Sequence, residues 1–428
     1  MSPAARRNYF ALSGFLFLYF MAQGATISLL SIWYARALGL SGEQTGIVFA
    51  ANSLVAMLSQ PLYGFVSDKL GLRQHVLWTI TALCIGCAPF FVYAYGPLFR
   101  VGVVLAAAVG GLYLGITFIA GSYAVESYVD RVGRKYGFEY GRARMWGSLG
   151  FACAALFSGR LYNLDPAYNY IVASLAGALL VPVLLCARID PTRTELEGAQ
   201  TVRLGTALSI LRMPQFWGFM VLILGVTDIY LVYDQQFPRY FASMFADPRV
   251  GNTMFGYLSS AQIFLEAGML FVAPAIVRRT GPKRGLLLAA AIMVVRIGGS
   301  GLATGPVMIS CMKLLHSLEL PILVVSVFKY IARHFDSRLA STVYLVGFSF
   351  GHSLGLTILS PIAGAAYDLI GFPRTYLLLA AFAGCFLVWA CFSLDGSPGE
   401  LAEPEPATST RPAELQQPAF RSATSLRK

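Results

Sequence analysis

Eight charged side chains lie within stretches of this sequence that are otherwise apolar enough to cross a lipid bilayer. An isolated charge at the centre of a bilayer costs at least ~2.5–3.5 kcal/mol on insertion scales, so such residues are rare and usually functional. We therefore expect a protein that moves a polar solute, protons or both. The eight residues are Glu126, Arg144, Asp228, Asp234, Glu266, Arg296, Lys313 and Glu319.

The first group of these residues has the chemistry of sugar binding. Glu126 ends one apolar run and Arg144 begins the next. A guanidinium presents a fork of N–H donors and a carboxylate accepts hydrogen bonds, so together they can bind adjacent hydroxyl groups. Phe151 follows Arg144 by two helical turns on the same face, where its ring can cover a pyranose. Glu266, away from any local base, is interpreted as a second sugar acceptor. The alternatives are a structural ion pair at the loop edge and, for Phe151, simple packing.

The second group has the chemistry of a proton carrier. Lys313, His316 and Glu319 are spaced by three residues, which places them on one face of a helix. We expect Asp234 to neutralise Lys313, which leaves Glu319 with His316 as a polar neighbour and Arg296 as a nearby cation. Burial favours a protonated carboxyl group and an approaching cation favours the ionised form. The alternatives are a satisfied structural network and, more weakly, a metal site without a second histidine. We expect a proton as coupling ion and no cofactor.

The elements that must hold these residues are long apolar runs. The chain has 428 residues, of which 57% are hydrophobic and only 12% charged. Soluble globular proteins carry about 25% charged residues, and a spanning helix needs roughly 20 apolar residues. The sequence therefore predicts an all-α membrane protein with about twelve transmembrane helices. The runs lie at 9–37, 44–66, 74–96, 100–127, 143–162, 168–187, 214–242, 253–277, 284–303, 306–332, 338–368 and 373–394.

The basic residues predict the orientation of these helices. If the N-terminus is inside, the inner loops and the N-terminus hold 19 Lys and Arg residues, whereas the outer loops hold 6. By the positive-inside rule, both termini are expected in the cytoplasm. Topology also accounts for the formal net charge of +11, so we expect no nucleic-acid partner.

The longest polar gap between the runs divides the predicted helices six and six. We interpret 1–187 and 214–394 as two pseudo-symmetric six-helix bundles and 188–213 as a cytoplasmic linker. The segment 395–428, rich in Pro, Glu, Ser and Thr, is predicted to be a disordered cytoplasmic tail. A short basic loop with glycine follows the second run and recurs after the eighth, at 278–284. This recurrence indicates duplicated bundles, and such transporters bind substrate near the midplane where the halves meet.

The loop after the second run, with Gly64, Asp68, Lys69 and Arg73, resembles the signature of the major facilitator superfamily. Glycine permits a tight turn and close packing. Asp68 with Lys69 and Arg73 can then form a cytoplasmic latch that gates transport. The alternative is a solvated basic turn.

From about residue 9 to residue 395 the chain resembles the oligosaccharide:proton symporter family, the lactose permease and sucrose permease group of that superfamily. The resemblance implies the major facilitator fold and sugar uptake coupled to a proton across a bacterial inner membrane. The motifs that carry it are Pro61-x-x-Gly64-x-x-Ser-Asp68-Lys69-Leu-Gly-Leu-Arg73, Phe138-Glu-Tyr-Gly-Arg-Ala-Arg144-Met, Asp234-Gln-Gln-Phe237, Phe255-Gly-Tyr257 and Lys313-x-x-His316-x-x-Glu319.

The same resemblance implies a role for individual residues. It assigns sugar contact to Glu126, Arg144 and His316. It assigns proton carriage to Glu319, with Arg296 as its modulator. A structural charge pair is implied for Asp234 and Lys313.

Some departures from the lactose-type pattern bear on the sugar. Lactose-type members have a sugar-binding Glu where this chain has Ile263 and an Asn where it has Glu266, so the carboxylate lies one turn along the same face. The run around Glu266 is similar to the sucrose permeases, and so is Ser148. Where this chain has Phe151, lactose permease has Trp and sucrose permease has Tyr. We therefore predict a sucrose-type disaccharide or small oligosaccharide, with a galactoside such as lactose, melibiose or raffinose as the alternative.

A further departure concerns a charge pair. Lactose-type members have an Asp and a Lys where this chain has Leu231 and His352, and here Asp228 lies one turn earlier. An unpaired Asp is costly inside a membrane. We hypothesise that Asp228 pairs with His352 or joins the sugar site.

The predicted function is therefore proton-coupled sugar symport by alternating access, with a monomer embedded in membrane lipid. Outside this class, the alternative is a sugar receptor that does not transport. The string Gly347-x-Ser349-x-Gly351 fits a hydrolase motif but lies in an apolar run instead of a strand–turn–helix, so we do not expect an enzyme.

Overall fold

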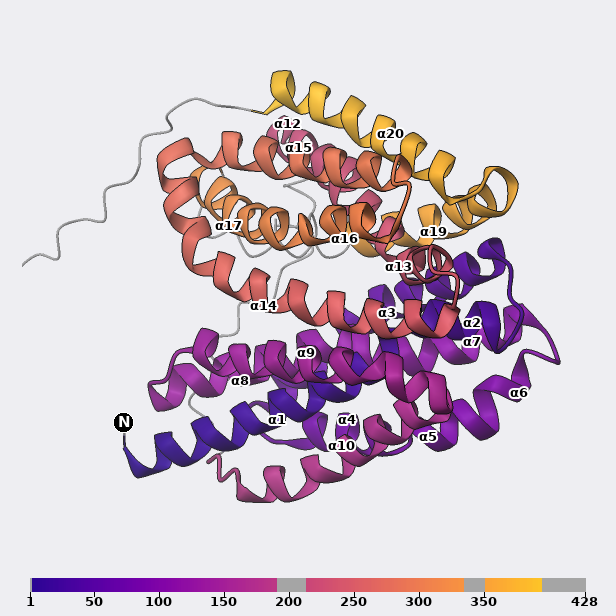
Figure 1. Ribbon diagram of the computed structural model, residues 1–428. Helices are drawn as coiled ribbons and strands as arrows, with labels where there is room; N and C mark the ends of the chain where they lie inside the picture. Colours follow the sequence, from indigo (N-terminus) through magenta and orange to yellow (C-terminus); the bar gives the residue numbers. More distant parts are fainter. Residues whose placement is uncertain (1, 191–212, 335–350, 395–428) are drawn as a thin grey trace, which may run out of the picture. The chain divides into compact units, whose positions relative to one another are not determined.

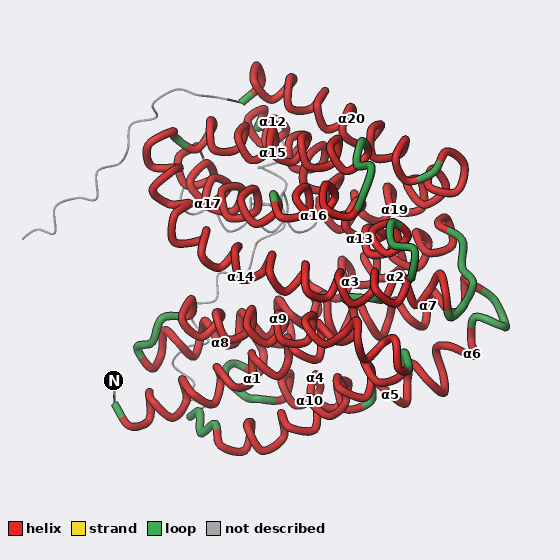
Figure 2. Tube along the Cα trace, in the orientation of Figure 1, coloured by secondary structure: helices red, strands yellow, loops and turns green. Residues whose placement is uncertain are grey.

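The computed structural model describes residues 2–190, 213–334 and 351–394. These residues form helices joined by short turns, and none of them forms a β-strand (Figure 2). Most of the predicted linker, the start of the eleventh predicted run and the predicted tail 395–428 lie outside the described residues, as do Gly347 and Ser349.

The first half of the chain folds into six helical passages, three of which are broken into shorter pieces. Two of the breaks are π-helical turns, η1 and η2, which are rare in helices and often mark functional positions. The passages are α1 (Pro3–Ile27) with α2 (Leu30–Arg36), α3 (Gly42–Leu70), α4 (His75–Ile85) with α5 (Cys87–Pro89), η1 (Phe90–Tyr95) and α6 (Gly96–Leu98), α7 (Val103–Leu114) with η2 (Gly115–Ala120) and α8 (Gly121–Tyr136), α9 (Tyr140–Leu164), and α10 (Ala167–Cys186).

The second half repeats this plan. Its first passage contains another π-helical turn, η4, and its fourth is interrupted at Leu315, between Lys313 and His316. The passages are α12 (Pro214–Leu222) with η4 (Ile223–Thr227) and α13 (Asp228–Ser243), α14 (Pro248–Thr280), α15 (Pro282–Gly301), α16 (Pro306–Leu314) with α17 (His316–His334), α19 (Gly351–Ile370), and α20 (Phe372–Ser393).

Every predicted apolar run overlaps one of these helices. In the described part of the chain, nine stretches are long and apolar enough to cross a membrane, and a tenth results if the bent pair His75–Ile85 and Cys87–Leu98 is one span. The stretch Gly351–Ser393 has 43 residues, about 65 Å of helix and twice the bilayer core. It turns at Gly371, whose φ is 79°, so it holds two predicted spans. The arginine-bearing helix α9 is not among the nine.

Each half packs mainly within itself. In the first half α1 lies along α9 and α10, and α3 lies along α7; in the second, α15 packs against α17 and α20. The halves meet where α3 lies along α19 and α9 lies along α14, and α2 adds a smaller contact with α13 (Figure 1).

Glycines allow the two halves to approach closely at one end of these helix pairs. A Cβ on Gly46 of α3 would lie 2.3 Å from the carbonyl oxygen of Ser360 on α19. A Cβ on Gly159 of α9 would lie 2.2 Å from the carbonyl oxygen of Asn252 on α14. No larger side chain fits without moving a backbone, so the halves touch directly here. We call this end, where α3 and α14 begin and α9 and α19 end, the closed end.

Polar contacts hold the closed end together as well. The Asp368 carboxylate on α19 accepts hydrogen bonds from the backbone N–H groups of Gly42 (2.8 Å) and Glu43 (2.9 Å), the first residues of α3. Gln236 Nε2 on α13 donates to the carbonyl oxygen of Gly42 at 2.9 Å. The second half thus supplies hydrogen-bond partners to the N-terminus of α3, whose first N–H groups have none within the helix.

The predicted gating loop begins later than the sequence suggested. Gly64 and Lys69 lie within α3, and so does the backbone of Asp68, because no helix-breaking residue separates them. The helix ends where Gly71 adopts a φ of 60°, and Arg73 follows in the turn. The expected loop is therefore the last two turns of a helix. The latch role of these residues remains a prediction.

Candidate functional site

Arg144 on α9 and Glu126 on α8 form an ion pair in the first half. Arg144 Nε donates to Glu126 Oε1, and Nη1 donates to Ser148 Oγ at 3.2 Å. Both charged side chains remain partly accessible, at 32% for Arg144 and 26% for Glu126. The structure therefore brings the two predicted residues together with the arginine still able to reach a solute.

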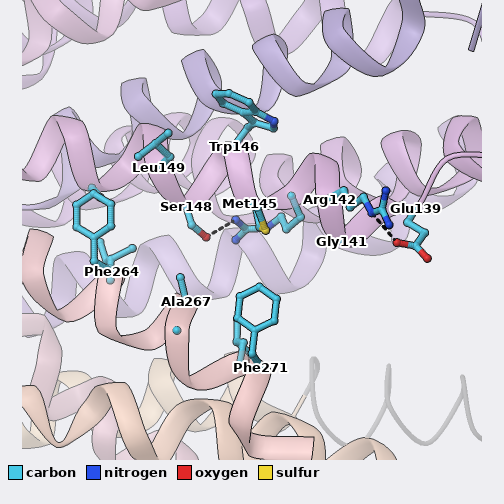
Figure 3. Close-up of a pocket in the computed structure, with 15 residues that line it drawn as sticks. Glu139, Gly141, Arg142, Met145, Trp146, Ser148, Leu149, Phe264, Ala267 and Phe271 are labelled. Carbon is cyan, nitrogen blue, oxygen red and sulfur yellow. Dashed lines mark hydrogen bonds and ion pairs between the residues drawn. The ribbon is translucent and has the colours of Figure 1, made fainter. Parts of the chain in front are cut away.

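Arg144 and Ser148 open into a cavity between α9 and α14 of about 840 Å³. Figure 3 shows Met145 and Ser148 on one side of it and Phe264, Ala267 and Phe271 on the other. The cavity follows the start of α9 and the second half of α14, away from the closed end. Its walls are largely apolar, and its polar side chains are those of Glu139, Arg142, Arg144 and Ser148, as expected for a small-molecule site.

Two other predicted sugar residues lie close to this cavity without forming its wall. Ile263 lines the cavity, whereas Glu266, one turn further along α14, is half-buried beside Ala267. Glu266 lies in the electrostatic field of Arg144 and His316, one from each half of the chain. Phe151 is half-buried on α9. It lies between Leu149 and Ala152, which both line the cavity.

The second half contains a buried network centred on Arg296 of α15. Arg296 is fully buried, and its Nε and Nη2 donate to the two oxygens of Glu319 at 3.0 and 2.7 Å. His316 Nδ1 lies 2.8 Å from Glu319 Oε1. Glu319 thus faces three nitrogen atoms in a site from which water is excluded, an arrangement that suits an ionised carboxylate.

The expected pair of Asp234 and Lys313 is part of the same network. Lys313 Nζ donates to Asp234 Oδ1 at 2.6 Å, and Arg296 Nη1 reaches that oxygen at 3.3 Å. The sequence predicts this pair as separate from Glu319 and Arg296. The link between them depends on which faces of α15 and α13 are turned towards each other, and the residue spacing along either helix does not show this.

Aromatic rings lie against both Arg296 and Lys313, and the sequence did not predict these contacts. The Arg296 guanidinium lies 4.7 Å from the ring centroid of Tyr233, and Lys313 Nζ lies 5.1 Å from that of Phe237. Both rings are on α13, where Phe237 lies three residues after Asp234 on the same helical face and Tyr233 directly precedes it. Cation–π contacts of this kind strengthen when the cation is removed from water.

Asp228 pairs with His352, as one of the two hypotheses expected. Its Oδ1 lies 2.7 Å from His352 Nδ1 on α19, and the Asp228 side chain is fully buried. Its Oδ2 is buried without a hydrogen-bond partner among the described residues. A Cβ on Gly355 would lie 1.7 Å from this oxygen, so only glycine fits there. Whether the pair also serves the sugar site stays a prediction.

We expect His352→Leu to destabilise the protein by about 3–5 kcal/mol, because it leaves a buried carboxylate without its partner. Adding Asp228→Asn removes that charge and is expected to restore most of the lost stability and the sugar uptake. Thermal unfolding of the purified protein and uptake into vesicles measure the two effects. Restored stability without restored uptake would place Asp228 in the sugar site instead.

Metal binding receives no geometric support. Within residues 2–190, 213–334 and 351–394, no group of three or more His, Cys, Asp and Glu side chains is arranged to hold a metal ion. His316 and Glu319 are engaged with each other and with Arg296.

Comparison with known proteins gives consistent results along nearly the whole chain. A family model described as LacY proton/sugar symporter matches residues 1–406. The chain is 40% identical over 412 residues to a lactose permease of Klebsiella oxytoca, covering 93% of this chain and 97% of the relative. It is 41% identical over 391 residues to a raffinose permease of Escherichia coli, covering 90% and 92%. A sucrose permease of Escherichia coli is 33% identical over 408 residues, covering 95% and 98%.

Solved structures agree on the fold. The crystal structure of the nucleoside transporter NupG matches with a TM-score of 0.76, covering 90% of this chain and 98% of NupG. At 14% sequence identity, this likeness concerns the arrangement of helices alone. The helices in the described part of the chain are thus arranged as in that structure.

Proposed function

Since the chain belongs to the LacY proton/sugar symporter family, we propose that it imports a sucrose-type disaccharide or small oligosaccharide together with a proton, by alternating access. The observation that carries the choice of sugar is the pattern on α14. Ile263 presents an apolar side chain to the cavity, and the carboxylate is at Glu266, as in the resemblance to sucrose permeases. An acceptor moved by one turn meets a different hydroxyl group of the bound sugar.

The sugar lies at the meeting of the two halves. Arg144 and Glu126 bind adjacent hydroxyl groups, and Phe151 covers the apolar face of the ring. Glu266 and His316 bind from the second half. The partial exposure of the Arg144 and Glu126 side chains and the position of Glu266 in the field of both Arg144 and His316 support this assignment.

The proton is carried by Glu319. Protonation of Glu319 removes the negative charge that binds the Arg296 guanidinium. Asp234, whose Oδ1 is already 3.3 Å from Arg296 Nη1, then remains as the partner of Arg296. When the protein opens to the cytoplasm, Arg296 returns to Glu319 and displaces the proton. His316 touches Glu319 and serves the sugar, so it links the two binding events.

A galactoside carrier is the second candidate. It is favoured by the higher identity to the lactose and raffinose permeases, at 40% and 41%, than to the sucrose permease, at 33%. Whole-chain identity averages over all helices, whereas sugar selection depends on a few side chains. We therefore give the α14 pattern more weight.

A competition panel tests the choice of sugar. Uptake of labelled sucrose is measured in vesicles with raffinose, melibiose, lactose and maltose as competitors, and again with labelled lactose. Raffinose contains both a sucrose unit and a galactoside unit, so it competes in either case and serves as positive control. We expect uptake of sucrose and weak competition by lactose and melibiose. Uptake of lactose that sucrose does not inhibit would favour the galactoside carrier.

Proton movement separates a carrier from a sugar receptor. Addition of the transported sugar to de-energised cells is expected to make the medium alkaline, because each sugar enters with a proton. A receptor gives no such change. We further propose that the protein works as a monomer in the lipid of the bacterial inner membrane, with both termini in the cytoplasm.

A further inference from the structure

Phe20 on α1 lies beneath the guanidinium group of Arg144. The Arg144 Cζ atom is 4.2 Å from the centroid of the Phe20 ring. Phe20 is 5% exposed, so this is a contact in the interior of the first half. Of the cations that lie over aromatic rings in the described residues, Arg144 is the closest to its ring.

The ring contact completes a three-sided support of the guanidinium. Its Nε donates to Glu126 and its Nη1 to Ser148 at 3.2 Å, while its flat face rests on Phe20. Within the described part of the chain, Nη2 makes no hydrogen bond to protein. A planar group held at one face and two nitrogen atoms has its orientation fixed, and the edge carrying Nη2 is left for a ligand.

Phe20 is linked through Tyr19 to η2, the segment that precedes the helix carrying Glu126. Its ring meets Tyr19 edge to face at 5.3 Å. The Tyr19 hydroxyl donates to the carbonyl oxygen of Thr117 at 2.8 Å, inside η2. Because η2 leads directly into α8, the ring and Glu126 belong to one packed unit that positions Arg144 from two directions.

Gly147 provides the space for this arrangement. It lies three residues after Arg144 on α9, and a Cβ there would be 2.7 Å from Cδ2 of Phe20 and 3.1 Å from Nη1 of Arg144. A side chain at this position would push either the ring or the guanidinium aside. Ring, guanidinium and glycine therefore form one packed group.

We propose that Phe20 is a positioning residue for sugar binding, which acts by fixing the plane of the Arg144 guanidinium so that its free edge faces the cavity. This rests on the proposed function, in which Arg144 binds the sugar. A flexible arginine loses conformational freedom when it binds, and a fixed one has already lost it, so pre-organisation raises affinity. The competing interpretation is that Phe20 is an ordinary core residue.

Phe15 is the matched control for that interpretation. It lies on the same helix, is fully buried, and also packs against Tyr19, with the two ring centroids 6.3 Å apart. Among the described residues, no cation lies over its ring. Phe15→Leu therefore removes a buried ring from the same core without touching Arg144.

The test compares Phe20→Leu, Phe20→Tyr and Phe15→Leu with the unmodified protein. Raffinose is the probe, and its dissociation constant is measured by titration calorimetry on protein in lipid nanodiscs, alongside the thermal unfolding temperature. We expect Phe20→Leu to raise the Kd about tenfold, as loss of a partly desolvated cation–π contact implies. Phe20→Tyr keeps an aromatic face and is expected to recover most of the affinity. Both leucine variants are expected to unfold at similarly lowered temperatures.

The outcomes are distinguishable. An unchanged Kd in Phe20→Leu, or an equal loss of affinity in Phe15→Leu, would overturn the positioning role while leaving the proposed function intact. Failure of the unmodified protein to bind raffinose would overturn the proposed function itself, and the positioning role with it. A tenfold weakening confined to Phe20→Leu, with recovery in Phe20→Tyr, supports the inference.

Discussion

Replacing Glu319 with glutamine is expected to abolish uphill sugar accumulation while sugar exchange across the membrane continues. Glutamine has the shape of the protonated side chain but neither gains nor loses a proton, so the sugar is no longer tied to the proton gradient. A membrane potential contributes about 2.3 kcal/mol per charge per 100 mV, which corresponds to a roughly fiftyfold ratio of inside to outside sugar concentration. In the variant, the sugar concentrations inside and outside are expected to become equal. Counterflow with labelled sugar in vesicles measures exchange, and energised vesicles measure accumulation.

Glu43→Gln is the control for this experiment, because Glu43 is an exposed carboxylate at the start of α3. It is expected to accumulate sugar normally. Accumulation by Glu319→Gln at the level of the unmodified protein would refute Glu319 as the proton carrier. Loss of exchange as well as accumulation would mean that Glu319 is needed to maintain the site.

Replacing Arg144 with lysine is expected to lower sugar affinity by about a hundredfold or more, although the charge is kept. Lysine is a point charge without a planar fork, and its three donors diverge from one nitrogen atom, so it cannot reproduce the geometry with which Arg144 bonds Glu126 and Ser148 and presents a further edge to a sugar. Hydrogen bonds to charged groups contribute about 1.5–3 kcal/mol each, so losing one or two accounts for this magnitude. The dissociation constant of the purified protein is the measurement.

Arg134→Lys is the matched control, on α8 and outside the lining of the cavity. Arg134 pairs with Asp130 at 2.7 Å, but the two side chains are 72% and 41% exposed, and exposed pairs contribute little. Its affinity is expected to stay within about twofold of normal. If Arg144→Lys bound sugar as tightly as Arg134→Lys, the role of the guanidinium fork would be wrong.

The sequence was sufficient to predict which charges lie near one another when they share a helix or complement each other. His316 and Glu319 are three residues apart, which places them on one face whatever the rest of the fold. Asp234 and Lys313 are opposite charges in apolar helices, and burying either alone is costly. Helical spacing and charge balance are local rules, so they hold before the fold is known.

Contacts that depend on how separate helices face one another were not predictable. The bridge from Arg296 to Asp234 requires a particular facing of α15 towards α13. Phe20 is one of 30 phenylalanines, and nothing in its neighbourhood along the chain relates it to Arg144. The end of α3 was placed too early because the polar residues around Asp68 were interpreted as a loop, whereas the helix continues through them and ends where Gly71 adopts a positive φ.

The contact of Asp368 with the start of α3 affects how easily the two halves can separate at the closed end. This contact at the closed end is made of hydrogen bonds at an exposed carboxylate. When the halves separate there, water can take the place of every partner that is lost, so the net cost of breaking each bond is small. A seam of buried apolar side chains would instead expose its whole surface on opening. The hydrogen bonds of Asp368 therefore add little to the free energy that keeps this end closed.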